Sequence, residues 1–250
     1  MNRERIAVIT GAGGGVGFAA AELLASEGSS VVLVGRDAEK LESASRELKA
    51  AHAIETLICA GDVTDSGFAH FVFTEARQTF GDLPVDLINN AGVIVRQSAE
   101  HTSDDDWRRV MATNVDGVFY LSRAMAKVAP AGSSIVNVSS TCGQVGAAGL
   151  AAYCTSKGAV DQLTRTMALE LAARDITINA VAPGAINSPM LFSEHQDPVV
   201  ANSVVSRNEA SIPLGRIAEP EEVAAAIVFL TKQRHITGTV LSVDGGYVAQ

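Results

Sequence analysis

Short runs of apolar and β-branched residues alternate with longer stretches of helical pattern along almost the whole chain. Strands that alternate with helices in this way indicate βαβ crossovers, which build a parallel sheet covered on both faces. We therefore predict an α/β fold with one doubly wound sheet of seven parallel strands and helices on both faces. The expected strands are residues 6–9, 31–34, 56–58, 85–88, 134–138, 177–181 and 240–243, and the expected helices are 15–27, 38–51, 66–79, 104–127, 152–173 and 220–232.

The chain has 250 residues without a long linker, repeat or low-complexity tract, so we expect a single domain over residues 1–250. One stretch interrupts the alternation. Residues 188–213 contain Pro189, Pro198 and Pro213, look irregular and follow the sixth expected strand. Doubly wound sheets bind ligands beyond the carboxyl ends of their strands, and loops of this length are often functional. The stretch therefore fits a surface insertion or a substrate-binding lid equally well.

Composition and charge exclude several classes of function. The formal net charge of −9, from 19 basic and 28 acidic residues, argues against nucleic acid or an anionic membrane as a partner. No apolar run approaches the roughly 18 residues that cross a bilayer, and no signal-peptide pattern is visible. Three cysteines make no disulfide framework and five histidines show no metal-ligand spacing, so we expect a cytoplasmic protein without a metal site.

A glycine-rich turn separates the first expected strand from the first expected helix. Glycine permits a tight turn and lets a phosphate approach main-chain N–H groups, and the amino terminus of the following helix adds partial positive charge. The spacing is not Gly-x-Gly-x-x-Gly, and no Lys-Ser or Lys-Thr follows as in a P-loop. The turn predicts a binding site for a dinucleotide diphosphate, formed by Gly11, Gly13, Gly14, Gly15, Val16 and Gly17.

The end of the second expected strand bears on which dinucleotide binds. A carboxylate there would accept hydrogen bonds from the ribose of NAD and repel the extra phosphate of NADP. This chain has Gly35 and then Arg36, whose guanidinium can pair with a 2′-phosphate and stack on adenine. Asp37 follows, and it suits either a ribose contact or the N-cap of the next helix. We favour NADP(H) and keep NAD(H) as the alternative.

Tyr153 and Lys157 stand four residues apart in a helical stretch, and Ser140 lies thirteen residues before the tyrosine. Side chains four apart share one face of a helix, and an ammonium beside a phenol favours the phenolate. Because a free tyrosine has a pKa of about 10, such neighbours would make Tyr153 better able to exchange a proton with an alcohol oxygen. Alone, the pair is weak evidence, because Tyr and Lys four residues apart also occur by chance on solvated helix faces.

The order and spacing of the motifs resemble the short-chain dehydrogenase/reductase family from about residue 4 to residue 247. The resemblance implies a Rossmann-type fold and hydride transfer between a nicotinamide cofactor and an alcohol or ketone. It rests on Thr10 to Gly17, Asp62-Val63, Asn89-Asn90-Ala91-Gly92, Thr113-Asn114-Val115, Asn137-Val138-Ser139-Ser140, Tyr153 to Lys157, Pro183-Gly184 and Leu241 to Gly246.

The family's roles carry over residue by residue as implications. Tyr153 would be the general acid/base, Lys157 would lower its pKa and hold the nicotinamide ribose, and Ser140 would hold the substrate oxygen. Asn114 would bend a helix and hold a water that links Lys157 to solvent. The other implied cofactor contacts are Asp62 and Val63 at the adenine, Asn90, Ala91 and Gly92 along a ribose, and Pro183, Gly184, Ile186 and Ser188 at the nicotinamide amide.

Several readings of function follow. We expect an oxidoreductase that acts on a secondary alcohol or ketone with NADP(H), and an NAD-linked polyol, sugar or hydroxysteroid dehydrogenase is the alternative. A noncatalytic nucleotide-binding scaffold would share the fold but would not need Ser140, Tyr153 and Lys157 together. A serine hydrolase is disfavoured because no Gly-x-Ser-x-Gly elbow surrounds Ser140.

The expected substrate pocket mixes one amide with apolar side chains, which suits ketones, hydroxyacyl groups, sterols or polyols, and the resemblance adds 3-oxoacyl thioesters. Helices 104–127 and 152–173 are richer in apolar residues than one sheet face requires. Such helices pack between subunits in the family, so the resemblance implies a homotetramer, with a dimer as the alternative. The expected pocket wall consists of Gln144, Val145, Met190, Leu191 and Phe192.

Overall fold

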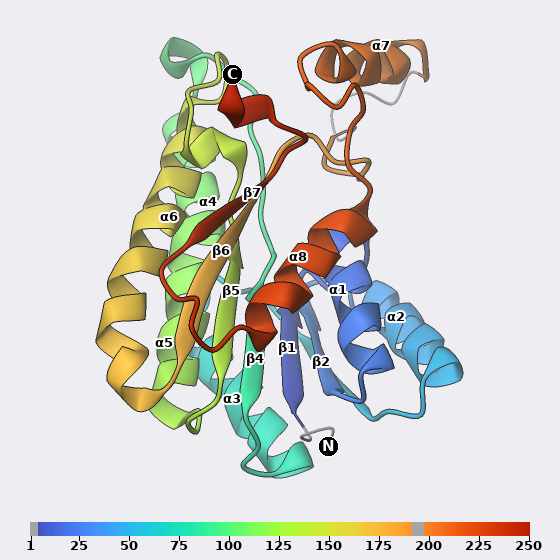
Figure 1. Ribbon diagram of the computed structural model, residues 1–250, viewed down its shortest axis with the longest axis vertical. Coiled ribbons are helices and arrows are strands. Elements are labelled where there is room, and N and C mark those ends of the chain that lie inside the picture. Colours follow the sequence, from blue (N-terminus) through green and yellow to red (C-terminus); the bar gives the residue numbers. More distant parts are fainter. Residues whose placement is uncertain (1–4, 192–197) are drawn as a thin grey trace.

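Seven parallel strands form one sheet in the order β3-β2-β1-β4-β5-β6-β7. The computed structural model describes residues 5–191 and 198–250, and its sheet lies between two layers of helices (Figure 1). This arrangement confirms the predicted doubly wound α/β fold. The strands are β1 (Ile6–Thr10), β2 (Ser30–Gly35), β3 (Thr56–Ala60), β4 (Val85–Asn89), β5 (Ser134–Val138), β6 (Thr177–Pro183) and β7 (Val240–Val243).

The helices divide between the two faces of the sheet. One layer contains α1, α2 and α8, and the other contains α3, α4, α5 and α6 (Figure 1). The bounds are α1 (Gly15–Ser26), α2 (Ala38–Ala51), α3 (Ser66–Phe80), α4 (Asp104–Met111), α5 (Gly117–Val128), α6 (Ala151–Leu171), α7 (Pro198–Glu209) and α8 (Pro220–Lys232).

The central strands are apolar at most positions because both of their faces are covered. Side chains alternate between the faces of a strand. In β1, Ile6 and Val8 therefore belong to the core under α3, α5 and α6, whereas Ala7 and Ile9 belong to the core under α1, α2 and α8. This double burial explains why the strands read as continuous apolar runs in the sequence.

Two predicted segments differ from the structure. The helix expected over 104–127 is divided into α4 and α5 by a π-helical turn at Ala112–Asp116. The stretch 188–213, expected to be irregular, contains α7. The first residue of α7 is Pro198, a residue type that fits the first turn of a helix, but the sequence of this helix lacks a clear apolar stripe. Within the described residues, no helix has both the length and the apolar character needed to cross a membrane.

Candidate active site

A cavity of about 390 Å³ lies at the carboxyl ends of the central strands. Its walls come from the glycine-rich turn, the loops after β4 and β5, the start of α6 and the segment after β6. The structure therefore brings together residues that are far apart in the sequence. The predicted site residues that line the cavity are Gly11, Gly14, Gly15, Val16, Asn90, Ala91, Gly92, Ser140, Tyr153, Lys157, Pro183, Gly184, Ile186, Ser188, Met190 and Leu191.

The glycine-rich turn leaves room for a ligand beside the amino terminus of α1. A Cβ atom added at Gly14 or Gly15 would have no neighbour within 4 Å, so both positions border open space. Gly14 is the N-cap and offers no side chain to the first N–H groups of the helix. Those donors and the positive end of the helix dipole suit a diphosphate. The turn thus fits the dinucleotide predicted from the sequence.

Gly17 has a different role, because it permits close packing. A Cβ atom at this position would lie 2.4 Å from the carbonyl oxygen of Gly11 and 2.6 Å from the side-chain nitrogen of Asn90. Backbone atoms cannot yield to such a contact. The start of α1 can therefore approach the end of β1 only if residue 17 has no side chain.

Thr10 and Asn90 join the turn after β1 to the loop after β4. The hydroxyl oxygen of Thr10 accepts hydrogen bonds from the backbone N–H groups of Asn90 and Ala91, at 2.9 and 2.8 Å. The side-chain amide of Asn90 donates in return to the carbonyl oxygen of Thr10, at 3.0 Å. These strands are neighbours whose helices leave to opposite faces, which is where doubly wound sheets bind ligands. These hydrogen bonds fix the turn after β1 and the loop after β4, which are two of the cavity walls, relative to each other.

Tyr153, Lys157 and Ser140 are buried side by side in the cavity. The Lys157 ammonium donates to the carbonyl oxygen of Val138 at 2.7 Å and lies 5.6 Å from the centre of the Tyr153 ring. Ser140 lines the same cavity, and its hydroxyl is close enough to the phenol to favour the phenolate of Tyr153 and so lower its pKa. Ser139 instead faces α6, where its hydroxyl donates to the carbonyl oxygen of Lys157 at 3.3 Å. Of the two adjacent serines, Ser140 is therefore the one beside the phenol.

Burial raises the pKa of Tyr153 above its ordinary value, and the nearby Cys142 thiol raises it further. The nearby hydroxyl of Ser140 and the positive charge of Arg96 act in the opposite direction but are weaker. We expected a lowered pKa for Tyr153. In the protein without a cofactor the pKa is raised instead, because the effect of burial outweighs that of the neighbouring charges. At neutral pH the phenol holds its proton and can act as a donor.

Burial lowers the pKa of Lys157 to about 8, and the carboxylate of Asp161 opposes this effect. Asp161 lies one turn further along α6 and is only 3% exposed. Burial raises the pKa of its carboxyl group and the nearby Ser139 hydroxyl opposes this effect, while its Oδ1 has no hydrogen-bond partner among the described residues. A Cβ atom at Gly143 would lie 2.9 Å from its Oδ2. Asp161 thus links the loop after β5 to the helix that carries Lys157. The sequence prediction missed it, although its spacing of four residues from Lys157 was a usable signal.

Asn114 lies inside the π-helical turn and is fully buried. Its side chain accepts from the N–H of Val93 at 2.8 Å and donates to the carbonyl oxygen of the same residue at 2.9 Å. It also donates to the hydroxyl of Ser156 at 3.0 Å. Asn114 therefore joins the loop after β4 to α6, and its predicted water link to Lys157 stays a prediction.

Other predicted cofactor residues lie outside the cavity walls. Gly13 is covered by Lys40, because a Cβ atom there would lie 3.0 Å from the lysine Cβ. Arg36 is exposed at the end of β2. Asp62 is exposed and accepts from the N–H of Thr64 at 2.9 Å, whereas Val63 is buried in the core. Their contacts to an adenine half of a cofactor stay predictions.

The predicted substrate wall is only partly assembled. Met190 and Leu191 line the cavity, but Gln144 and Val145 are exposed outside its walls. The amide oxygen of Gln144 accepts a hydrogen bond from the hydroxyl of Ser242 at 3.0 Å, which directs this side chain to β7. Phe192 lies outside the described residues.

Several cavity residues were not predicted. Arg96 is the most informative, since it follows Gly92 by four residues in the loop after β4, and loops at this edge bind ligands. Its guanidinium donates to the carbonyl oxygen of Met190 at 3.2 Å. The other unpredicted wall residues include Ile94, Thr141, Cys142, Leu150 and Asn208.

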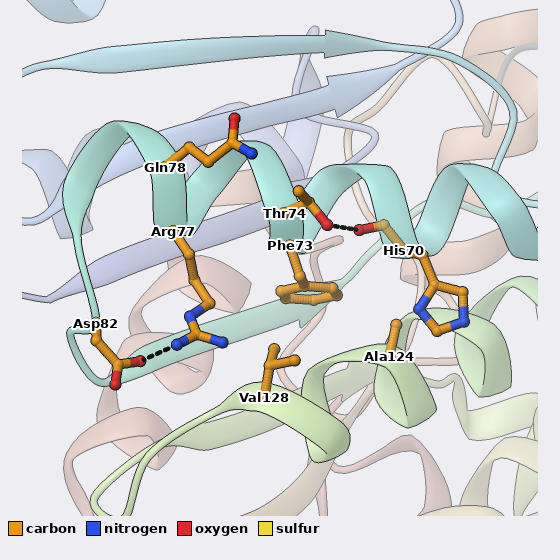
Figure 2. Close-up of a pocket in the computed structure, with 8 residues that line it drawn as sticks. All are labelled: His70, Phe73, Thr74, Arg77, Gln78, Asp82, Ala124 and Val128. Atoms are coloured by element: carbon orange, nitrogen blue, oxygen red, sulfur yellow. Dashed lines mark hydrogen bonds and ion pairs between the residues drawn. The ribbon is translucent and has the colours of Figure 1, made fainter.

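A second cavity of about 390 Å³ lies between α3 and α5. In it, Arg77 pairs with Asp82 at 3.1 Å across the end of α3 (Figure 2). None of the site residues predicted from the sequence lines this cavity. Over residues 5–191 and 198–250, no three His, Cys, Asp or Glu side chains gather in a way that would hold a metal ion.

Comparison with known proteins identifies relatives over almost the whole chain. A family model described as "Enoyl-(Acyl carrier protein) reductase" matches residues 11–248. The chain is 40% identical to cis-4-hydroxycyclohexanecarboxylate dehydrogenase of Sinomonas cyclohexanicum, over 98% of this chain and 97% of the relative. It is 38% identical to galactitol 2-dehydrogenase (L-tagatose-forming) of Cereibacter sphaeroides, over 96% and 94%.

A solved structure supports the same relationship. The short-chain dehydrogenase/reductase of Brucella melitensis, described as a glucose/ribitol dehydrogenase, superposes with a TM-score of 0.87. It is 33% identical to this chain, and the match covers 98% of this chain and 96% of that one.

The buried pair of Lys157 and Asp161 leads to a testable pH effect. We expect Asp161→Asn to lower the pKa of Lys157 further below about 8, because the carboxylate that favours the charged amine is lost. The measurement is the Nζ chemical shift of 15N-lysine-labelled protein as a function of pH. Glu170→Gln, at an exposed position of the same helix, is the control and should leave the titration unchanged. An unchanged Lys157 titration in Asp161→Asn would mean that the carboxylate has no effect on the amine.

Proposed function

The chain belongs to the short-chain dehydrogenase/reductase family, and on this premise we propose that it interconverts a secondary alcohol and a ketone with NADP(H), using Tyr153 as the general acid/base. The observation that supports the proposal is the burial of the Tyr153 phenol, the Ser140 hydroxyl and the Lys157 ammonium in one cavity that the glycine-rich turn also borders. Carbonyl reduction by hydride needs a proton for the oxygen, so a proton donor beside a nucleotide site fits an oxidoreductase that acts on CH–OH groups.

The proposed proton transfer follows from the environment of the phenol. A bound nicotinamide cofactor supplies the hydride in the reductive direction and accepts it in the oxidative one. Ser140 donates a hydrogen bond to the substrate carbonyl, and Tyr153 gives its proton to the oxygen as the carbon is reduced. Lys157 stabilises the phenolate that remains until a proton returns from solvent. Alcohol oxidation reverses these steps, with Tyr153 as the base.

The raised pKa of Tyr153 keeps the phenol protonated in the protein without cofactor, which is the form that carbonyl reduction needs. A phenol that keeps its proton is ready to donate it. Oxidation needs the phenolate, and a cationic nicotinamide near the ring would favour that form. The physiological direction therefore depends on which form of the cofactor is bound.

The preference for NADP(H) rests on the charges at the end of β2. Arg36 is exposed there, next to the strand that carries the glycine-rich turn. The carboxylate of Asp37 accepts from the N–H of Lys40 at 3.2 Å and pairs with its ammonium at 3.5 Å. Asp37 is thus occupied as the N-cap of α2, and the two cations around it favour a 2′-phosphate.

The names of two relatives suggest where a substrate search should begin. Galactitol and cis-4-hydroxycyclohexanecarboxylate both carry secondary hydroxyl groups. We take polyols and ring alcohols, with the corresponding ketones, as the first compounds to test.

Residues 188–213 follow β6 at the cavity and are proposed as the lid over the substrate, since Met190, Leu191 and Asn208 line the cavity. Three free cysteines fit a reducing, cytoplasmic compartment.

The role of Tyr153 is tested by removing only its hydroxyl. Tyr153→Phe should lower kcat about 10²- to 10⁴-fold, the usual contribution of a general acid or base, while the affinity for NADPH stays near that of the wild type. Turnover is followed by NADPH absorbance and binding by its fluorescence. Tyr120→Phe is the matched control and should retain activity. A fully active Tyr153→Phe protein would exclude the proposed acid/base.

The cofactor preference is tested by titration at one salt concentration. Wild-type protein should bind NADPH at least about tenfold more tightly than NADH, a difference of about 1.4 kcal/mol. Arg36→Ala should remove this preference, whereas Arg46→Ala, exposed on α2, should keep it. If the wild type binds NADH as tightly as NADPH, the assignment to Arg36 is wrong and the search moves to NAD-linked oxidation.

We propose that the chain forms a homotetramer through the helices on the α4–α6 side of the sheet. Trp107, Phe119 and Leu169 are exposed on α4, α5 and α6, and Leu169 is 84% exposed. These helices lie on the same side of the sheet, and contiguous exposed apolar patches mark interaction surfaces. Light scattering should give a mass four times the 26.0 kDa of the chain. A mass of 26.0 kDa would exclude assembly, and twice that mass would support the dimer.

A further inference from the structure

We propose that Ser156 is a positioning residue of the site, which holds the side-chain amide of Asn114 in one orientation between the loop after β4 and the start of α6. The proposal rests on the proposed function and deepens it, because it assigns a residue that acts through Asn114 on Tyr153 and Lys157. Ser156 is not among the described residues that line the cavity, so it can act only through its neighbours.

Ser156 is fully buried, and its hydroxyl both donates and accepts a hydrogen bond. It donates to the carbonyl oxygen of Tyr153 at 2.7 Å and accepts from the Nδ2 of Asn114 at 3.0 Å. Lys157 follows Ser156 directly in the chain. One hydroxyl group therefore joins the π-helical turn to the turn of α6 that carries both the phenol and the ammonium.

The hydroxyl of Ser156 determines which way the amide of Asn114 can point. A hydroxyl has one proton, and because this one is donated to Tyr153, the oxygen can only accept from Asn114. The Nδ2 must therefore face Ser156, which leaves the Oδ1 to accept from the N–H of Val93 at 2.8 Å. A flipped amide would place oxygen against oxygen at one end and two donors against each other at the other. Ser156 and Val93 thus favour the same orientation.

This orientation matters because the Oδ1 of Asn114 lies close to the ammonium of Lys157. A Cβ atom added at Gly92 would lie 3.3 Å from the Oδ1 and 3.7 Å from the Nζ. Both atoms therefore border the same small space beside Gly92, which itself lines the cavity. The oxygen is the negative end of the amide dipole, so in this place it favours the positive charge of Lys157. An amide free to turn would lose part of this effect.

Three titratable groups also lie near the ammonium of Lys157. Asp161 on α6 and Cys142 on the loop after β5 both favour the charged amine, against the effect of burial. The ring centre of Tyr153 lies 5.6 Å from the Nζ. All three groups are kept when only the hydroxyl of Ser156 is removed, so this change tests the amide without altering any titratable neighbour.

Thr164 provides a matched control in the same helix. Its hydroxyl donates to the carbonyl oxygen of Val160 at 2.8 Å and accepts from the Nδ2 of Asn137 at 2.9 Å. Thr164 is as fully buried as Ser156 and lies about two turns further along α6. Ser156→Ala and Thr164→Val therefore remove the same kind of hydroxyl, and both should lower the unfolding temperature to a similar extent.

The first measurement is the steady-state reduction of L-tagatose and of 4-oxocyclohexanecarboxylate with NADPH, two ketones suggested by the names of the relatives. Ser156→Ala should lower kcat at least about fivefold, an effect of the size of one buried hydrogen bond, with KM within about twofold of the wild type. Thr164→Val should keep both constants. Ser156→Thr keeps a hydroxyl that can bond the preceding turn, so it should retain most of kcat.

The second measurement needs no substrate. It is the Nζ chemical shift of 15N-lysine-labelled protein as a function of pH. Ser156→Ala should lower the pKa of Lys157 further below about 8, whereas Thr164→Val should leave it unchanged. The double variant Ser156→Ala/Asn114→Ala should titrate as Asn114→Ala alone does, because the hydroxyl acts through the amide.

The two measurements separate this inference from the proposed function. If the wild type reduces neither ketone, a Lys157 titration that shifts in Ser156→Ala and not in Thr164→Val would still support the positioning role. An unchanged titration in Ser156→Ala, equal shifts in Ser156→Ala and Thr164→Val, or additive effects in the double variant would overturn it and leave the proposed function intact.

A Ser156→Ala enzyme that keeps the kcat of the wild type would also overturn the inference. If Ser156→Ala does not fold, Ser156→Cys takes its place in every comparison, because a thiol is only a weak donor and a weak acceptor.

Discussion

Burying the ammonium of Lys157 is the constraint on which most of the site depends. A cation that leaves water is costly unless other groups replace its hydration. Here the replacements come from the carbonyl oxygen of Val138 at the end of β5, the ring of Tyr153 and the carboxylate of Asp161 on α6. Asp161 is itself buried, with the Ser139 hydroxyl near its carboxyl group and Gly143 in close approach to its Oδ2. The loop that carries Ser140 is therefore held against α6 as a result of one buried charge.

Local sequence patterns were sufficient to predict the sheet and the centre of the site. The seven strands could be predicted because residues such as Ile6 and Ala7 are buried on opposite faces, which gives most of the strands a run of apolar residues. The glycine-rich turn could be predicted because a side chain at Gly17 would collide with the backbone of Gly11. Tyr153 and Lys157 share a helix face at a spacing that is visible in the sequence. In each case the physical reason acts within a few residues or along one element.

The features that sequence patterns did not predict depend on contacts between distant segments. The apolar pattern continues through residues 104–127, and the π-helical turn appears only where Asn114 bonds Val93 and Ser156. Arg96 looks like an ordinary loop arginine until the segment after β6 folds back and Met190 accepts its hydrogen bond. Gln144 seemed suited to a substrate, but Ser242 of β7 accounts for its amide. Their side-chain directions are decided by tertiary structure, which one stretch of sequence does not contain.

The position of β1 between β2 and β4 also determines when this strand can complete its pairing during translation. Ile6 pairs with Ser30 on one side but with Val85 on the other. When the first three strands have left the ribosome, β1 is still an open edge with unpaired main-chain groups and apolar faces. It stays so until β4 has been translated, and closing this long loop carries an entropic cost before any contact is gained. During that interval the nascent chain exposes an unpaired strand edge, which is prone to aggregation and is the kind of surface that chaperones protect.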